Sequence, residues 1–151
     1  MMDLQQLYQD VIIDHNKNPR NFGKPETSDH EAKGNNPLCG DKVTVYLTIA
    51  DGVIENVQFE ARGCAISVAS ASMMTELVKG KTLEQARAFF EDFREVVTRK
   101  GDVGPDDLER LDKLAVLTGV RAFPMRVKCA TLPWHTMSAA LDSSENEVTT
   151  E

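Results

Sequence analysis

The chain has 151 residues, 41% of them hydrophobic and 27% charged, which suits one globular domain with its own core. Its formal net charge of −7, from 24 acidic and 17 basic residues, disfavours nonspecific binding to nucleic acid or to anionic membranes. No apolar run is long enough to span a membrane and the first residues lack the features of a secretory signal, so we predict a cytoplasmic protein without nucleic-acid or membrane partners.

The first predicted element is an amphipathic helix that begins near residue 4. Its apolar stripe recurs at the three- and four-residue spacing of a helix and consists of Leu4, Leu7, Tyr8, Val11 and Ile12, with His15 on the same side. The helix should end near Asn18, because Pro19 disfavours helical backbone at the residue before it. Residues 19–40 are rich in Pro, Gly and Asn, which predicts a loop with room for one short strand.

Residues 42–62 are predicted to form a β-hairpin with one buried face. Apolar side chains alternate with polar ones, and Asp51-Gly52 supplies a two-residue turn that tolerates positive φ. The predicted buried face contains Val43, Val45, Leu47 and Ile49 in the first strand and Val57, Phe59 and Ala61 in the second.

Helical patterns follow the hairpin. The predicted helices cover residues 65–79, 83–100, 108–118 and about 129–141. Thr82 with Gln85 three residues later is a capping box and marks the start of the second of these helices. Pro133 is awkward inside the last helix, which should therefore either begin later, near Ala130 or Thr131, or be kinked.

A hairpin followed by helices predicts an α+β fold, with helices packed on one face of a small antiparallel sheet. The sheet should consist of the β-hairpin and a short edge strand. Residues 1–141 are predicted to form a single domain. Residues 142–151 lack periodicity and are predicted to form a flexible tail.

The three cysteines carry the clearest chemistry of the chain. Cys39 stands two residues before Asp41, so in an extended chain both side chains would point to the same side. Cys64 lies at a strand-to-helix junction, where a helix N-terminus favours thiolate. Cys129 follows Lys128 and should precede the last helix, a setting that also favours thiolate. Three thiols and one carboxylate supply the four ligands of tetrahedral Zn²⁺.

A purely structural role for the thiols is the alternative, because an isolated free cysteine is usually a buried packing residue. An odd and low number of cysteines without an export signal instead indicates thiols that bind metal or react in a reducing compartment. Arg62, Arg126 and Lys128 stand beside the candidate ligands in sequence and can offset their negative charge. The carboxylate of Asp41 is a harder ligand than thiolate and is the one expected to be displaced.

Five segments of the chain resemble the IscU/NifU N-terminal family in order and spacing, over about residues 3–141. These segments are His15-Asn16-Lys17-Asn18-Pro19-Arg20-Asn21-Phe22-Gly23, Asn36-Pro37-Leu38-Cys39-Gly40-Asp41, Gly63-Cys64-Ala65-Ile66-Ser67, Val78-Lys79-Gly80-Lys81 and Arg126-Val127-Lys128-Cys129-Ala130. IscU-type members have a histidine where this chain has Lys128, and they lack the insertion at about residues 98–119. The chain is therefore more similar to the SufU-type iron–sulfur cluster assembly proteins of this family.

This resemblance implies that Cys39, Asp41, Cys64 and Cys129 bind Zn²⁺ and that Cys39 accepts persulfide sulfur. It also implies a SufS-type, PLP-dependent cysteine desulfurase as the sulfur donor and a downstream cluster scaffold as the recipient. The Leu-Pro-Pro-Val-Lys segment that IscU-type members present to an Hsp70-class chaperone is replaced here by residues 123–128, which argues against that partner.

Three functions remain open from the sequence. The first is a sulfurtransferase-type relay that passes persulfide sulfur toward iron–sulfur cluster assembly. The second is a scaffold that assembles a transient [2Fe–2S] cluster on the same ligands, because thiolates bind both zinc and iron. The third is a zinc domain whose metal only stabilises the fold.

Overall fold

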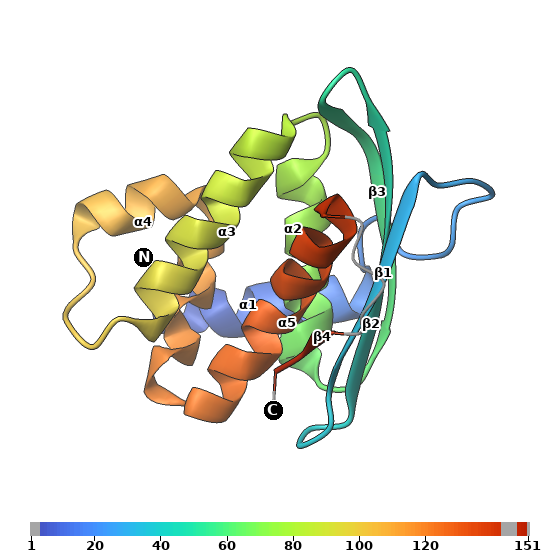
Figure 1. Ribbon diagram of the computed structural model, residues 1–151. Helices are drawn as coiled ribbons and strands as arrows, with labels where there is room; N and C mark the ends of the chain where they lie inside the picture. The colour runs from blue at the N-terminus through green and yellow to red at the C-terminus, as the bar shows by residue number, and fades with distance from the viewer. Residues whose placement is uncertain (1–3, 143–147, 151) are drawn as a thin grey trace.

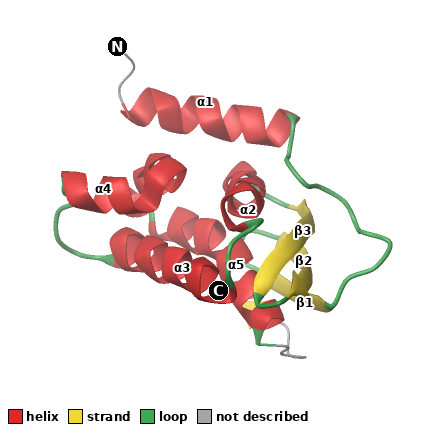
Figure 2. Ribbon diagram, turned by 90° about the horizontal axis from the view of Figure 1, so that it is seen from above, coloured by secondary structure: helices red, strands yellow, loops and turns green. Residues whose placement is uncertain are grey.

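The chain forms, in a computed structural model, one four-stranded sheet with the helices stacked against a single face (Figure 1). The structure describes residues 4–142 and 148–150. Seen from above, α2 (Ala65–Val78) and α5 (Pro124–Leu141) lie next to the sheet, and the other helices lie farther from it (Figure 2). The predicted α+β architecture is confirmed.

The sheet contains β1 (His30–Asn36), β2 (Asp41–Ala50), β3 (Val53–Arg62) and β4 (Val148–Thr149), in the spatial order β3-β2-β1-β4. The two pairings within β1, β2 and β3 are antiparallel, and β4 runs parallel to β1. The connection between β1 and β2 is only four residues long, which brings the end of β1 directly beside the start of β2.

The predicted hairpin is formed by β2 and β3. Asp51 and Gly52 form its two-residue turn and both have positive φ, of 52° and 75°, as the right-handed twist of a hairpin favours. Within the predicted face, the pairs Val45–Phe59 and Leu47–Val57 stand opposite each other and are fully buried. The register shifts between Thr48 and Ile49, where a bulge lets the strands continue to the turn.

The short strand expected between residues 19 and 40 is β1, which pairs with β2 along its whole length. Its sequence is polar, so tertiary pairing rather than local propensity makes it a strand. Gly34 allows β1 to pack closely on the last helix, because a Cβ at this position would collide with the hydroxyl of Thr136.

Five α-helices and one 3₁₀ segment cover the face of the sheet among the described residues. They are α1 (Leu4–Lys17), α2 (Ala65–Val78), α3 (Leu83–Thr98), α4 (Pro105–Leu111), the 3₁₀ segment η1 (Asp112–Ala122) and α5 (Pro124–Leu141). Helices α2 and α5 contact the sheet, α1 lies across α2 and η1, and α3 packs on α5 and η1. The predicted capping box at the start of α3 is confirmed by reciprocal hydrogen bonds between Thr82 and Gln85.

The prediction of one helix over residues 108–118 is wrong. Helix α4 ends at Leu111, because Asp112 adopts a positive φ of 53° that no right-handed helix can continue through. The following residues form the tighter η1 segment, in which Leu114 and Leu117 are fully buried. Their apolar spacing reflects burial in the core rather than a continuous α-helix.

The predicted start of the last helix, near Cys129 or later, is also wrong. Helix α5 begins at Pro124, where the missing N–H of proline is not needed by the helix. Pro133 lies inside α5 and is buried, so the later start at Ala130 or Thr131 is excluded. Because Pro133 has no N–H, the carbonyl of Cys129 lacks its usual donor within the helix.

The last described part of the predicted tail pairs with the sheet. Val148 and Thr149 pair with β1, the Thr150 N–H donates to the carbonyl of Asn35 at 3.2 Å, and the Thr150 hydroxyl donates to the carbonyl of Lys128. Residues 143–147 and 151 of that prediction lie outside the described residues. Among the helices that are described, none combines the length and apolarity needed to cross a membrane.

Candidate metal centre

The first two candidate ligands are Cys39, in the four-residue connection between β1 and β2, and Asp41 directly after it. Asn36 ends β1 and stands opposite Asp41, the first residue of β2. The backbone N–H of Cys39 donates to the carbonyl of Asn36 at 3.2 Å, which closes the loop. The thiol of Cys39 is half-buried and the carboxylate of Asp41 is fully buried. A tight turn, not the predicted extended chain, thus brings Cys39 and Asp41 together.

Cys64 reaches this loop from the start of α2. It is the N-cap residue of the helix, and its backbone N–H donates to Asp41 Oδ1 at 2.7 Å. Its Sγ lies 3.5 Å from Asp41 Oδ2. The preceding residue, Gly63, has a φ of +137° and packs against Asp41, where a Cβ would lie 2.7 Å from the Asp41 Cα. The Gly-Cys pair therefore allows the helix start to approach the carboxylate closely.

Cys129 approaches the same point from α5. It is buried, and its Sγ lies 3.4 Å from Sγ of Cys39. The prediction that Cys129 precedes the helix is wrong, since it lies in the second turn of α5. The side-chain amide of Asn36 donates to its sulfur at 3.8 Å.

The structure therefore brings all four predicted ligands to one place. One ligand atom each from Cys39, Asp41 and Cys129 lie within 4.8 Å of one another, and Cys64 joins this group through Asp41. Tetrahedral Zn²⁺ with bonds of about 2.3 Å to sulfur holds its ligand atoms about 3.8 Å apart. The sulfurs of Cys39 and Cys129 lie 3.4 Å apart and Cys64 Sγ lies 3.5 Å from Asp41 Oδ2, both close to this value, so the donor set fits zinc in both chemistry and size.

The cysteines differ in acidity. The pKa of Cys64 is lowered to about 7, chiefly by a hydrogen bond with Cys129 and further by the N–H groups of Ser67 and Ile66 at the start of α2. The same hydrogen bond and burial raise the pKa of Cys129. In the metal-free protein the negative charge thus prefers Cys64, as its helix N-terminus predicts. The expectation that Cys129 also favours thiolate is not met without metal, because its hydrogen bond with Cys64 and its burial raise its pKa.

Comparison with known proteins assigns the chain to a family. The NifU-like N terminal domain matches residues 7–130 of the chain. The chain belongs to this family. The zinc-dependent sulfurtransferase SufU of Bacillus subtilis is 40% identical over 143 residues, which cover 95% of each chain. The predicted recognition of a SufU-type member of the IscU/NifU N-terminal family is confirmed.

Other members of the family share the chain over most of its length. The iron–sulfur cluster assembly scaffold protein IscU of Thermotoga maritima is 33% identical over 140 residues, or 93% of this chain and 96% of that protein. Among solved structures, a putative iron–sulfur cluster assembly scaffold protein for the SUF system from Fervidobacterium islandicum AW-1 is 34% identical. Its TM-score is 0.81, with 91% of this chain and 98% of that one covered.

The basic residues expected beside the ligands of this NifU-like domain take different positions. The guanidinium of Arg126 lies over the ring of Phe123, 4.3 Å from its centroid. Arg62 is exposed and Lys128 is half-buried. No ion pair joins these three side chains to Asp41 within the described part of the chain. In the described residues these three side chains therefore do not offset the charge of Asp41 by direct ion pairing.

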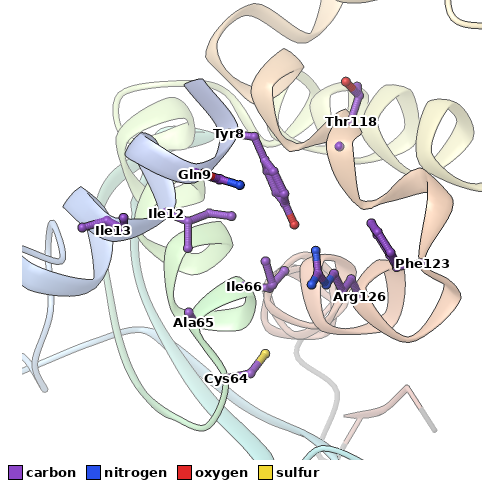
Figure 3. A pocket seen from close by; sticks show the side chains of 11 residues that line it. Tyr8, Gln9, Ile12, Ile13, Cys64, Ala65, Ile66, Thr118, Phe123 and Arg126 are labelled. Carbon is purple, nitrogen blue, oxygen red and sulfur yellow. The ribbon is translucent and has the colours of Figure 1, made fainter. Parts of the chain in front are cut away.

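A groove of about 820 Å³ opens beside the centre of the NifU-like domain (Figure 3). It lies between α1, the start of α2, η1 and the start of α5, and Cys64 forms part of its wall. The Tyr8 side chain extends into it from α1 (Figure 3). Ile13 and Phe123 line its rim and are about half exposed, so the wall offers apolar contact area next to the thiols.

Asn36 is the site residue that sequence reasoning missed. Asparagine is common in turns, so its presence before Pro37 indicated only a loop. The signal that could have identified it is its position directly before the segment that holds both Cys39 and Asp41.

Proposed function

We propose that the protein is a zinc-dependent sulfur acceptor, which takes persulfide sulfur from a cysteine desulfurase and passes it on for iron–sulfur cluster assembly. The observation that carries this proposal is that ligand atoms of Cys39, Asp41 and Cys129 lie within 4.8 Å of one another. The backbone N–H of Cys64 donates a hydrogen bond to Asp41 beside them. The similarity to a zinc-dependent sulfurtransferase over 95% of the chain supports it. A relay based on free thiols suits a reducing compartment, and we place the protein in the cytoplasm.

Cys39, Asp41, Cys64 and Cys129 would hold the zinc ion. A bound Zn²⁺ keeps its cysteine ligands deprotonated at neutral pH, which supplies thiolates without a separate base. The buried carboxylate of Asp41 accepts the N–H of Cys64 and ties the helix start to the ligand loop. Asp41 is also the hardest of the four ligands, which makes it the natural one to give way to an incoming group.

Cys39 is the proposed sulfur acceptor. It lies on the short loop and is half-buried, and its neighbour Leu38 is 60% exposed. Cys129, by contrast, is only 2% exposed. Its thiolate attacks the outer sulfur of the partner's persulfide, and a new S–S bond forms at Cys39. The old S–S bond breaks and the partner's cysteine leaves as thiolate, so that no oxidant or reductant is consumed.

The proposed donor is a SufS-type, PLP-dependent cysteine desulfurase, and the proposed recipient is a downstream cluster scaffold. Exposed apolar side chains stand near the ligands in sequence: Leu38 directly precedes Cys39, and Phe123 and Met125 lie at the start of α5, the helix that carries Cys129. Aromatic and methionine side chains of this kind are enriched where proteins dock. The groove beside Cys64 gives the donor's persulfide-bearing segment an apolar wall to rest on.

A second candidate function is a scaffold for a [2Fe–2S] cluster on the same ligands. The 33% identity to an IscU scaffold protein over 93% of the chain favours it. The chemistry of three thiolates and one carboxylate suits iron as well as zinc. Lys128 in place of a histidine removes one ligand option that a cluster would use.

Metal content and sulfur transfer, measured on one preparation, test both functions. Protein purified without added metal is expected to contain stoichiometric zinc, to lack visible absorbance and to accelerate cysteine turnover by a SufS-type desulfurase. Mass spectrometry of the reacted chain should find one additional sulfur on the peptide that contains Cys39. A coloured, iron-containing protein that hands its cluster to an apo-acceptor would instead establish the scaffold. A zinc protein whose cysteines all fail to gain sulfur would contradict transfer.

Gly63→Ala is expected to weaken zinc binding without removing a ligand. The new methyl group would collide with Asp41, and alanine is strained at a φ of +137°. Displacing a group that orients a ligand typically costs about 10- to 100-fold in metal affinity, and we expect a loss in this range. Competition with a chromophoric chelator measures it. Gly101→Ala is the control, because its Cβ would lie no closer than 3.8 Å to another residue; equal affinities of the two variants would contradict this packing argument.

A further inference from the structure

Asn36 is a fully buried polar residue at the end of β1 whose side chain contacts two parts of the metal centre. Its Nδ2 donates to Sγ of Cys129 at 3.8 Å, and its Oδ1 accepts the backbone N–H of Leu38 at 3.2 Å. Its backbone carbonyl accepts the N–H of Cys39. One residue thus connects the loop that carries Cys39 with the sulfur of Cys129 on α5.

The sulfurs of Cys39 and Cys129 lie only 3.4 Å apart. A persulfide that reaches Cys39 therefore comes within a few ångströms of Cys129 as well. Burial protects Cys129 in part, but both sulfurs belong to the same small group of ligand atoms. Transfer to one defined cysteine needs a feature that distinguishes the two thiolates.

A hydrogen bond to sulfur supplies such a distinction. An N–H group that donates to a thiolate draws electron density from it, which stabilises the charge and lowers the reactivity of that sulfur. Cys129 receives such a bond from Asn36, whereas Cys39 receives no side-chain N–H among the described residues. The Oδ1 atom meanwhile holds the backbone of the loop, so the same amide keeps Cys39 at its place on the surface.

We propose that Asn36 is a positioning residue that makes the two thiols unequal: it holds Cys129 as the retained metal ligand and presents Cys39 as the sulfur acceptor. This inference rests on the proposed function. An amide suits the role because it offers a donor and an acceptor at once. An aspartate would have no donor when ionised and would stand opposite Asp41 in the β1–β2 pair. A leucine would have neither a donor nor an acceptor.

The test compares Asn36→Ala and Asn36→Leu, which both remove the amide but differ in the volume they leave. Agreement between them identifies the hydrogen bonds, and not packing, as the cause. Asn56→Ala on β3 is the matched control, because the amide of Asn56 donates to Gln58 and not to a residue of the centre. Circular dichroism establishes which variants fold. If only one Asn36 variant folds, its cobalt band and sulfur position are compared with those of the wild type and of Asn56→Ala.

The first readout is the absorption spectrum of Co²⁺-loaded protein, which needs no desulfurase. Loss of an N–H···S bond raises the energy of the sulfur electrons, so the thiolate-to-cobalt charge-transfer band should move to longer wavelength in both Asn36 variants. Zinc affinity should fall by about 10- to 100-fold. The control should keep the wild-type spectrum. Variant bands that coincide with the wild type, or a wild-type chain that binds no cobalt, would overturn the proposal.

The second readout is the position of the sulfur after a single transfer. Peptide mass spectrometry should find it on Cys39 alone in the wild type and divided between Cys39 and Cys129 in the Asn36 variants. A purely structural Asn36 would lower the melting temperature but leave the sulfur on Cys39 and the cobalt band in place, which would contradict the positioning role. A wild-type chain that accepts no sulfur would refute the proposed function, while the cobalt spectrum would still decide the role of Asn36.

Discussion

Replacement of Cys39 by serine is expected to reduce the stimulation of a cysteine desulfurase to the level measured without the protein. Serine is nearly isosteric with cysteine, but its hydroxyl is a poor nucleophile toward persulfide at neutral pH. Because Cys39 lies on a surface loop and is half-buried, the fold should tolerate the change. The measurement is the rate of cysteine turnover by the desulfurase, with the zinc content of the variant determined in parallel.

Leu38→Ala is the matched control for this experiment. Leu38 is the neighbour of Cys39 on the same loop and is 60% exposed, so its replacement changes the surface but no ligand. We expect it to weaken the apparent affinity for the desulfurase at most and to leave the maximal rate near the wild-type value. Full stimulation by the Cys39→Ser variant would reject Cys39 as the acceptor, whatever its metal content.

Removal of zinc is expected to lower the melting temperature by about 8 to 16 °C. The ligands come from the β1–β2 loop, the start of α2 and the second turn of α5, so the metal joins segments that are far apart in the chain. Binding to the native state alone adds about 4 kcal/mol when the free metal exceeds its dissociation constant 1,000-fold. For a domain of this length each kcal/mol corresponds to roughly 2 to 4 °C. Calorimetry with and without a strong chelator measures the difference.

The control for this prediction is Cys64→Ser, which lacks one of the proposed ligands. Its melting temperature should respond much less to added zinc or chelator than that of the wild type. If the wild-type transition stays unchanged while metal analysis shows that the zinc is gone, no metal joins these three segments. The same variant also tests whether Cys64, which lies outside the closest group of three ligand atoms, belongs to the site.

The elements predicted correctly are those whose signals lie within a few neighbouring residues. The two-residue periodicity of β2 and β3, with Asp51-Gly52 between them, specifies a hairpin without reference to the rest of the chain. The same holds for α3, whose capping box needs only Thr82 and Gln85. Such local rules identify an element's type and position because the interactions that stabilise it are short in sequence.

The elements that local patterns specify poorly depend on partners distant in sequence. The polar strand β1 exists because β2 lies beside it, and β4 pairs with β1 from the far end of the chain. Two predicted helix boundaries are also wrong, and each error lies at a single residue. Asp112 adopts a positive φ and ends α4, and Pro124 begins α5 five residues before the predicted start.

The sequence by itself determined the chemistry of the centre: which side chains can bind a metal, and that Cys64 stands at a helix start where thiolate is favoured. Only the tertiary structure decided that these side chains meet. Residues 39 and 129 are 90 positions apart, and their sulfurs are 3.4 Å apart because α5 packs on β1 and β2. Likewise, the contact of Gly63 with Asp41 and the bond from Asn36 to Cys129 arise from packing between segments that no local pattern connects. Residue identity sets what a side chain can do, while its neighbours in space set how buried, charged and reactive it becomes.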